Sequence, residues 1–171
     1  MRICLTGGTG FLGREVASAL LAAGHEVVHL ARSPGPQTVV LDLLCDDPGP
    51  VLRDLRPDAL VHLAWYAVPG RFWQAPENLE WLAASLRLVR AFAAHGGGRL
   101  ITAGTCAEYD WSYRLLDEQL TPMRPATLYG EAKASLCRMI GQVAGPLDLA
   151  WASGCIFFPY GPHEQPGRLF S

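Results

Sequence analysis

Hydrophobic and polar positions along this chain alternate between two patterns, short continuous apolar runs and longer segments of helical period. The short runs predict buried β-strands over Arg2 to Thr6, Glu26 to Ala31, Thr38 to Asp42, Ala59 to Leu63, Arg99 to Ala103 and a last stretch near Leu147 to Trp151. The helical pattern covers Phe11 to Ala23, Val51 to Leu55, Glu77 to His95 and Leu128 to Ala144. Such alternation is typical of a parallel sheet with helices on both faces, because right-handed crossovers return each helix across the sheet. The pattern therefore predicts a doubly wound α/β fold, with the strand order 3-2-1-4-5-6.

Composition and charge narrow the classes of function. With 171 residues, 50% of them hydrophobic, the chain can bury one sizeable core, so residues 1–171 are predicted to form a single domain. The net charge of −2 and the lack of a basic run argue against nucleic acid or an anionic membrane as a partner. The apolar runs are too short or interrupted to cross a bilayer, and the opening strand pattern leaves no room for a signal peptide. We therefore expect a cytoplasmic protein with a small-molecule partner, whose five scattered cysteines are reduced thiols and not metal ligands.

A glycine-rich turn connects the first predicted strand to the first predicted helix. In the segment TGGTGFLG, Gly7 and Gly10 allow the backbone to turn sharply and approach a pyrophosphate, and Gly13 allows the helix to pack against the strand. The free N–H groups of the helix N-terminus then face the phosphates. A plain tight turn is the alternative, but the position at the start of successive βα units favours a dinucleotide site of the Rossmann type. Phe11 and Leu12, within the segment, belong to the predicted cofactor contacts.

The end of the second predicted strand indicates which dinucleotide is bound. A carboxylate about twenty residues after the turn usually binds the ribose hydroxyl of NAD, whereas an arginine accommodates the 2′-phosphate of NADP. Arg32 lies there and no carboxylate does, so NADP is preferred to NAD, with a solvated surface arginine as the alternative. Asp42, closing the third strand, is a candidate for the adenine pocket, although a turn role suits it nearly as well. Leu43, Ala64 and Lys133 complete the predicted cofactor contacts.

Tyr129 and Lys133 lie four positions apart at the start of the last predicted helix, which puts both side chains on one face. Together with the glycine turn, this pair carries a resemblance to a known family. The blocks TGGTGFLG, VHLAW, GTCAEYDW, YGEAK and FFPYGPHE follow the order of the extended short-chain dehydrogenase/reductases. The sequence is similar above all to the nucleotide-sugar epimerases, dehydratases and 4-ketoreductases of the NAD(P)-dependent epimerase/dehydratase family, over essentially its whole length.

The resemblance implies a catalytic site made of Thr105, Tyr129 and Lys133. A free tyrosine has a pKa of about 10, and a nearby ammonium and a cationic nicotinamide favour its phenolate, so Tyr129 is the predicted proton donor or acceptor. Lys133 is expected to lower the pKa of Tyr129 and to hydrogen-bond the nicotinamide ribose. Thr105, at the end of the fifth strand, is expected to hold the substrate oxygen. The alternatives are an ordinary surface pair for Tyr129 and Lys133, and a turn hydroxyl for Thr105.

Departures from the family pattern bear on the substrate. Cys106 and Ala107 replace the Asp-Glu pair of the dehydratases, which disfavours dehydration, and Glu108 follows closely but is displaced in register. Cys155 and Phe158 stand where an arginine and an asparagine are common. Family members also continue past the last block into a C-terminal portion that supplies most substrate contacts, and that portion is largely absent from these 171 residues.

Two functions of different classes remain. The first is an NAD(P)-dependent reductase or epimerase acting on a keto group of a nucleotide-activated sugar, with reduction preferred because Arg32 favours NADP. The second is a truncated, non-catalytic dinucleotide-binding module, which the short chain favours. The retained Thr105, Tyr129 and Lys133 argue against the second, because a pure binding module does not need them.

The resemblance also implies a homodimer built from the helices Glu77 to His95 and Leu128 to Ala144. In the first helix a stripe at helical spacing predicts a core-facing side, made of Leu79, Leu82, Leu86, Val89 and Phe92. This leaves Trp81, Ala83 and Leu88 for the second, outward face.

Overall fold

Six parallel strands form one sheet in the computed structural model, which describes residues 1–161 and 164. The strands are β1 (Arg2–Thr6), β2 (Glu26–Ala31), β3 (Thr38–Val40), β4 (Ala59–His62), β5 (Arg99–Thr105) and β6 (Ala150–Ile156). Their order is β3-β2-β1-β4-β5-β6, and every neighbouring pair is parallel. The predicted fold class and strand order are therefore confirmed.

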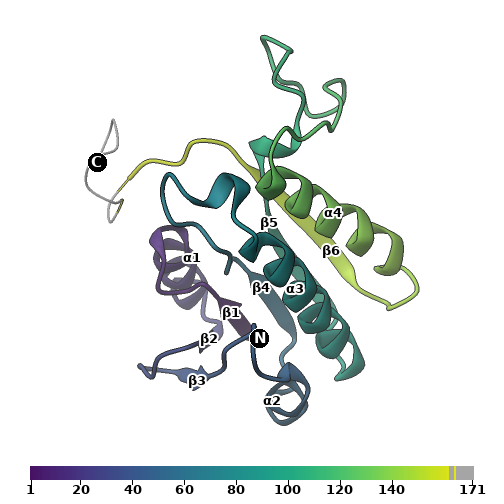
Figure 1. Cartoon of the computed structure of the whole chain (residues 1–171). Coiled ribbons are helices and arrows are strands. Elements are labelled where there is room, and N and C mark those ends of the chain that lie inside the picture. The colour runs from purple at the N-terminus through teal and green to yellow at the C-terminus, as the bar shows by residue number, and fades with distance from the viewer. Residues whose placement is uncertain (162–163, 165–171) are drawn as a thin grey trace.

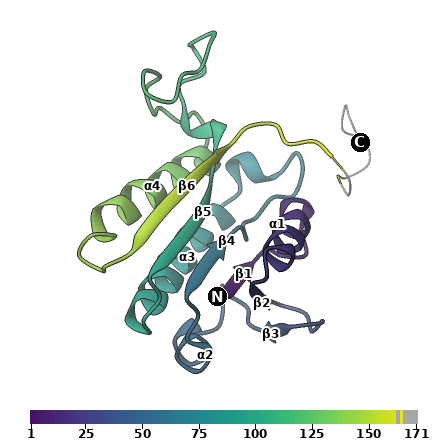
Figure 2. The ribbon, with the colours of Figure 1, turned by 180° about the vertical axis from the view of Figure 1, so that it is seen from behind.

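Helices cover the sheet from both sides. Figure 1 shows α3 (Glu77–Ala94) and α4 (Leu128–Val143) side by side over one face, with α2 (Pro48–Leu55) beside α3. The opposite face carries α1 (Phe11–Ala22). Figure 2 shows this face, with the molecule turned by 180° from the view of Figure 1. Two short 3₁₀ helices follow the carboxyl ends of β4 and β5, namely η1 (Phe72–Gln74) and η2 (Cys106–Glu108). The functional loops thus gather at the edge where parallel strands end.

A separate apolar core lies on each side of the sheet. The core under α2, α3 and α4 is the larger, and its fully buried side chains include Leu60, Leu88, Phe92, Leu100 and Ile140. The core under α1 is smaller and contains Ile3, Leu5, Ala17, Val27, Ala59 and Val61. Burial on both faces is why β1 and β4 read as continuous hydrophobic runs.

The described residues cover only one face of β5 and β6. On β5, Leu100 and Thr102 are buried against the helices, whereas Ile101, pointing the other way, is 41% exposed. On β6, Ala152 and Gly154 are exposed on that same outer side. No described helix lies over this part of the sheet in Figure 2.

The last strand begins later than the sequence pattern predicts. It was expected near Leu147 to Trp151, but turns continue beyond α4 until Leu149, whose N–H donates to the carbonyl oxygen of Ala144 at 2.8 Å. Within these turns Asp148 adopts a left-handed conformation, with φ of 53°. Pairing with β5 therefore starts only at Ala150. It extends to Ile156 and includes Gly154, a residue of low strand propensity.

The inward face of α3 also differs from the predicted stripe. Phe92 and Val89 are buried as expected, but Leu79 is 57% exposed, and Leu88, assigned to the outward face, is fully buried. Trp81, also assigned outward, packs against the core. The prediction of the inward face of α3 failed because it was based on the spacing of apolar residues and ignored polar residues that are buried.

Two buried polar residues, Asn78 and Ser85, define the true inward face of α3. Both are satisfied by hydrogen bonds: Asn78 to the loop before the helix, and Ser85 to His62 of β4. A polar residue with buried partners belongs to the core face as much as a leucine does.

Two further observations concern the chain as a whole. No helix in the described parts of the chain is both long and apolar enough to span a membrane. All five cysteines are free thiols.

Candidate active site

The glycine turn is shaped by two close backbone approaches. Gly7 has a φ of +72°, and a Cβ atom there would lie 2.7 Å from the backbone nitrogen of Ala64, so only glycine suits this position. A Cβ atom on Gly13 would collide with the carbonyl oxygen of Gly7. Gly13 therefore packs the helix against the turn itself, where the sequence predicted a contact with the strand. At Gly10, by contrast, a Cβ atom would meet only the carbonyl oxygen of Gly7, at 3.3 Å, and face open space otherwise.

A buried hydrogen-bond chain holds this turn against the end of β4. The hydroxyl of Thr6 lies 2.7 Å from Nδ1 of His62, and Nε2 of His62 lies 2.8 Å from the hydroxyl of Ser85. Thr6 also accepts from the backbone N–H groups of Leu63 and Ala64, at 3.2 Å each. Burial is the main cause that lowers the pKa of His62 to about 3, so its imidazole is neutral. One set of hydrogen-bond directions fits a neutral imidazole. Thr6 donates to Nδ1 of His62, Nε2–H of His62 donates to Ser85, and Ser85 donates to the carbonyl oxygen of Trp81.

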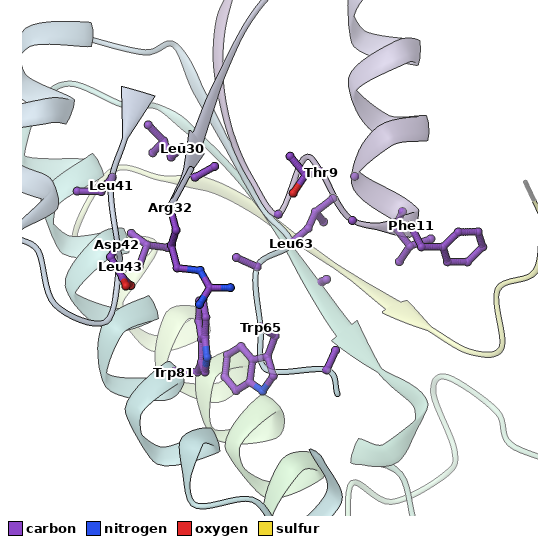
Figure 3. Close-up of a pocket in the computed structure, with 18 of the residues that line it drawn as sticks. Thr9, Phe11, Leu30, Arg32, Leu41, Asp42, Leu43, Leu63, Trp65 and Trp81 are labelled. Atoms are coloured by element: carbon purple, nitrogen blue, oxygen red, sulfur yellow. The ribbon is translucent and has the colours of Figure 1, made fainter. Parts of the chain in front are cut away.

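A pocket of about 490 Å³ opens at the carboxyl ends of β1, β2 and β4. It is lined by most of the sequence-predicted cofactor residues, namely Gly7, Gly10, Phe11, Leu12, Gly13, Arg32, Asp42, Leu43 and Ala64. Figure 3 shows that these side chains come from the turn, from the ends of β2 and β3, and from the segment after β4. Of the predicted set, only Lys133 does not line it.

Arg32 and Asp42 lie on the same side of this pocket (Figure 3). The guanidinium of Arg32 points into the pocket, is exposed, and has no ion-pair partner among the described residues. The carboxylate of Asp42 accepts from the N–H of Leu44 at 3.0 Å. Asp42 is thus a turn residue that also lines the pocket, and its place in an adenine site stays a prediction.

Thr105 and Tyr129 meet at the carboxyl end of β5. Thr105 ends the strand, and the first turn of α4 packs directly on η2, since a Cβ atom on Gly130 would collide with the carbonyl oxygen of Ala107. The hydroxyl of Thr127 caps α4 by accepting from the N–H of Gly130 at 3.0 Å. In this position the side chain of Thr105 lies close enough to the hydroxyl of Tyr129 to lower its pKa.

The ring of Tyr129 is enclosed by aromatic residues of η1. Phe72 and Trp73 both approach it edge to face, with ring centroids 4.9 and 5.9 Å away. Gln74 fixes η1 to the helix by accepting from the N–H of Leu128 at 3.2 Å. Burial raises the pKa of Tyr129 above its ordinary value, while the neighbouring side chain of Thr105 opposes this rise.

Lys133 is buried behind the pocket wall. Its side chain is 6% exposed, and its ammonium lies 4.3 Å from the centroid of the Trp65 ring, a cation–π contact. Trp65 itself lines the pocket and donates from its indole N–H to Asn78 at 2.8 Å. Burial lowers the pKa of Lys133 to about 8, while the carboxylate of Glu108 raises it. Trp65 is thus the link between the two halves of the site.

Sequence reasoning missed Trp65, Trp81 and Glu108 as parts of the site. The block VHLAW contains Trp65, but the pattern did not tell a pocket side chain from a core one. Trp81 was assigned to the outward face of α3 and lines the pocket instead. One signal pointed to a special environment around Lys133, and hence to partners for it. Lys133 is the only lysine among 171 residues, in a chain that otherwise uses arginine for its basic side chains.

Two of the noted departures lie near the predicted catalytic residues. Cys106 is buried directly after Thr105, and Cys155, on β6, lies close enough to the hydroxyl of Tyr109 for each group to affect the pKa of the other. Burial raises the pKa of both thiols, to about 11 for Cys155, so both are neutral. Phe158, in contrast, is 71% exposed and lies beside Trp111 on the outer loop.

Comparisons with known proteins agree with this geometry. The sequence model of the NAD dependent epimerase/dehydratase family matches residues 3–171. A dTDP-6-deoxy-L-talose 4-dehydrogenase (NAD(P)(+)) of Kitasatospora kifunensis is 33% identical over 77% of this chain and 44% of its own length. A UDP-glucose 4-epimerase of Corynebacterium glutamicum is 28% identical over 98% of this chain and 54% of its own length.

A solved structure extends the similarity to three dimensions. MoeE5 in complex with UDP-glucose and NAD superposes with a TM-score of 0.80 at 28% identity, over 97% of this chain and 57% of that one. The chain therefore spans about half the length of the relatives it matches. From the fold, the glycine turn and the matched sequence, we conclude that this chain belongs to the NAD-dependent epimerase/dehydratase family.

Proposed function

We propose that this protein is an oxidoreductase that uses NADP in preference to NAD and acts on a keto group of a nucleotide-activated sugar. One observation carries the proposal. The side chain of Thr105 acts on Tyr129, and the ammonium of Lys133, on the same helix as Tyr129, packs on Trp65, which lines the pocket at the glycine turn. A dinucleotide site and a proton-transfer site are thus neighbours, which is what hydride transfer coupled to proton transfer requires.

The residues of the pocket suit a phosphorylated dinucleotide. The N-cap of α1, Gly10, has no side-chain hydrogen bond, so the first N–H groups of the helix remain available for a pyrophosphate. Arg32 offers a planar, unpaired guanidinium at the end of β2, which matches a 2′-phosphate. A bound nicotinamide would supply the hydride.

In the proposed reduction, Tyr129 donates its proton to the carbonyl oxygen of the substrate as the hydride reaches the carbonyl carbon. Burial favours the protonated phenol, which suits a proton donor, and the hydroxyl of Thr105 stabilises the phenolate that remains. Thr105 also orients the substrate oxygen, and solvent returns the proton to Tyr129. Lys133 supplies positive charge beside this centre.

The substrate class rests on the relatives. The names of the matched relatives include UDP-glucose and dTDP-6-deoxy-L-talose enzymes, so a nucleotide-sugar is the proposed substrate. Cys106 and Ala107 provide no acid–base pair for dehydration, and Arg32 favours NADP, which reductases that release their oxidised cofactor commonly use. We therefore favour net reduction over epimerisation.

A second function, a dinucleotide-binding module without turnover, is favoured by one fact. The chain spans about half the length of its relatives. The buried Thr105 and Lys133, with the half-buried Tyr129 beside them, count against this second function.

The test is hydride transfer, followed by the loss of NADPH absorbance with a 4-keto-sugar nucleotide. Tyr129→Phe should lose most turnover and keep its affinity for NADPH, because only the proton carrier is removed. Thr105→Ala should cost about a hundredfold, as expected for one lost hydrogen bond to the substrate oxygen. NADPH binding without turnover in the parent would favour the second function, and a Tyr129→Phe variant as active as the parent would refute the first.

A further inference from the structure

A buried carboxylate lies at the centre of the candidate catalytic site. Glu108 is the last residue of η2, the short helix directly after β5. Its side chain is only 2% exposed, which is unusual for a glutamate. Its carboxylate accepts from the backbone N–H of Thr105 at 2.7 Å, while the hydroxyl of Thr105 accepts from the N–H of Ala107 at 3.3 Å. These two bonds form a capping box, so Glu108 fixes the backbone of Thr105 from behind.

Glu108 on η2 and Lys133 on α4 are both buried, and α4 packs on η2, although the two charged groups lie beyond ion-pair distance. A carboxylate this deeply buried costs free energy unless it has partners of opposite charge or hydrogen-bond donors. The charge of Lys133 lowers the pKa of Glu108, and the charge of Glu108 raises that of Lys133. Lys133 has the Trp65 ring on another side and no ion pair within direct contact among the described residues.

We propose that Glu108 is a positioning residue of the catalytic site, a buried carboxylate that holds Thr105 through its backbone and supplies the counter-charge for Lys133. The role as a positioning residue for catalysis rests on the proposed function. The charge pairing itself does not, because it concerns this chain alone.

The pairing has a clear physical purpose. Burial disfavours the ammonium form of Lys133, and its pKa falls to about 8 even with Glu108 present. Without a carboxylate nearby, desolvation would lower the pKa of Lys133 further, toward neutral pH, where a larger share of the amine is uncharged. Glu108 keeps Lys133 charged, so that Lys133 can act on Tyr129 and on a bound ribose, and it does so while restraining Thr105.

Several other titratable groups surround this pair. They come from η2, from α4, from β4 and from β6, and they are Cys106, Tyr109, Tyr129, Cys137, Arg138, His62 and Cys155. Among the described groups that act on Glu108, the cations are Lys133 and Arg138. A test of the pairing must therefore follow the titration of Lys133 separately from these neighbouring groups.

The composition of the chain makes this measurement direct. Because Lys133 is the only lysine, selective ¹³C labelling of lysine gives a single side-chain signal in the 171 residues, read in a protein with a lysine-free tag. We expect this signal to titrate with a pKa near 8 in the parent. In Glu108→Gln, which keeps a carbonyl acceptor for Thr105 but loses the charge, the pKa of Lys133 should fall by about one unit.

Glu131→Gln is the matched control, because Glu131 lies two positions from Lys133 but is exposed and paired with Arg138. This variant should leave the titration of Lys133 unchanged. Glu108→Asp, which keeps the charge, should restore most of the parental pKa. An unchanged Lys133 pKa in a folded Glu108→Gln variant would overturn the proposal.

The parent offers a second measurement that needs no variant. With glutamate carboxyl carbons labelled, the titration of Lys133 should appear as a coupled shift of one glutamate signal at the same midpoint. Absence of any coupled glutamate shift would also overturn the proposal. Both readouts are taken without cofactor or substrate, so they can fail while the oxidoreductase function stands, and the reverse also holds.

Discussion

At the scale of single residues, His62 links the site to the acid stability of the protein. Its neutral imidazole joins Thr6, at the glycine turn, to Ser85 on α3. Its pKa is lowered from 6.5 to about 3, mainly by burial and further by the charge of Lys133. As the pH falls below 6.5, the unfolded chain therefore binds a proton that the folded chain refuses.

We expect the free energy of unfolding to decrease by up to about 1.4 kcal/mol per pH unit as the pH falls from about 6.5 to about 5. Urea unfolding at several pH values measures this slope. His62→Gln, which cannot titrate, should be less stable at neutral pH but should show a flatter slope over that range. The same slope in the parent and the variant would contradict the assignment of the effect to His62.

The sequence alone predicted the residues that line the pocket better than the surroundings of Thr105, Tyr129 and Lys133. The glycine turn and Arg32 have fixed places relative to strand ends, so a pattern of spacing was enough to find them. Glu108 and Trp65 could not be found in this way, because the packing of Trp65 on Lys133, and the charge with which Glu108 shares a buried site, are set by the fold and not by sequence spacing. Glu108 looked like a displaced loop carboxylate until the capping box with Thr105 was seen.

At the scale of elements, the sequence predicted which helices and strands exist, and the errors lay at their ends and faces. α2 begins at Pro48, earlier than expected, because Asp47 caps it by accepting from Gly49 at 2.9 Å and proline is tolerated in a first helical turn. β6 begins late because turns extend α4. Both effects are local hydrogen bonds that hydrophobic periodicity does not register.

Strand β5 offers a test of how the sheet is covered. Leu100 is fully buried under α3 and α4, whereas its neighbour Ile101 faces the uncovered side and is 41% exposed. Leu100→Ala should lower the free energy of unfolding by about 3 kcal/mol, since it leaves a cavity in the larger core. Ile101→Ala should cost about 1 kcal/mol or less.

Chemical denaturation of the two variants provides the comparison. Each variant is a control for the other, because both substitutions remove three side-chain carbon atoms and the two positions are adjacent on β5. If Ile101→Ala were as destabilising as Leu100→Ala, the outer face of β5 would be covered in solution, contrary to this description.

At the scale of the whole molecule, we propose a homodimer through α3 and α4, as the family resemblance implies. Three apolar side chains on these helices are exposed, Leu79, Met139 and Val143, at 57%, 49% and 38%. Light scattering should give twice the chain mass, and Met139→Glu should give a monomer that still folds, because a buried unpaired charge opposes association. A monomeric parent at high concentration would count against the dimer.

The central claim is that the pocket at the glycine turn binds a phosphorylated dinucleotide, and titration calorimetry on the chain tests it most directly. We expect one site that binds NADPH about tenfold or more tightly than NADH, because Arg32 is matched to the 2′-phosphate. Gly10→Val should abolish binding while the chain still folds, since a side chain there points into open pocket space. Arg32→Asp should remove the preference for NADPH. Undetectable binding of either dinucleotide to the parent, or parental affinity in Gly10→Val, would contradict the account.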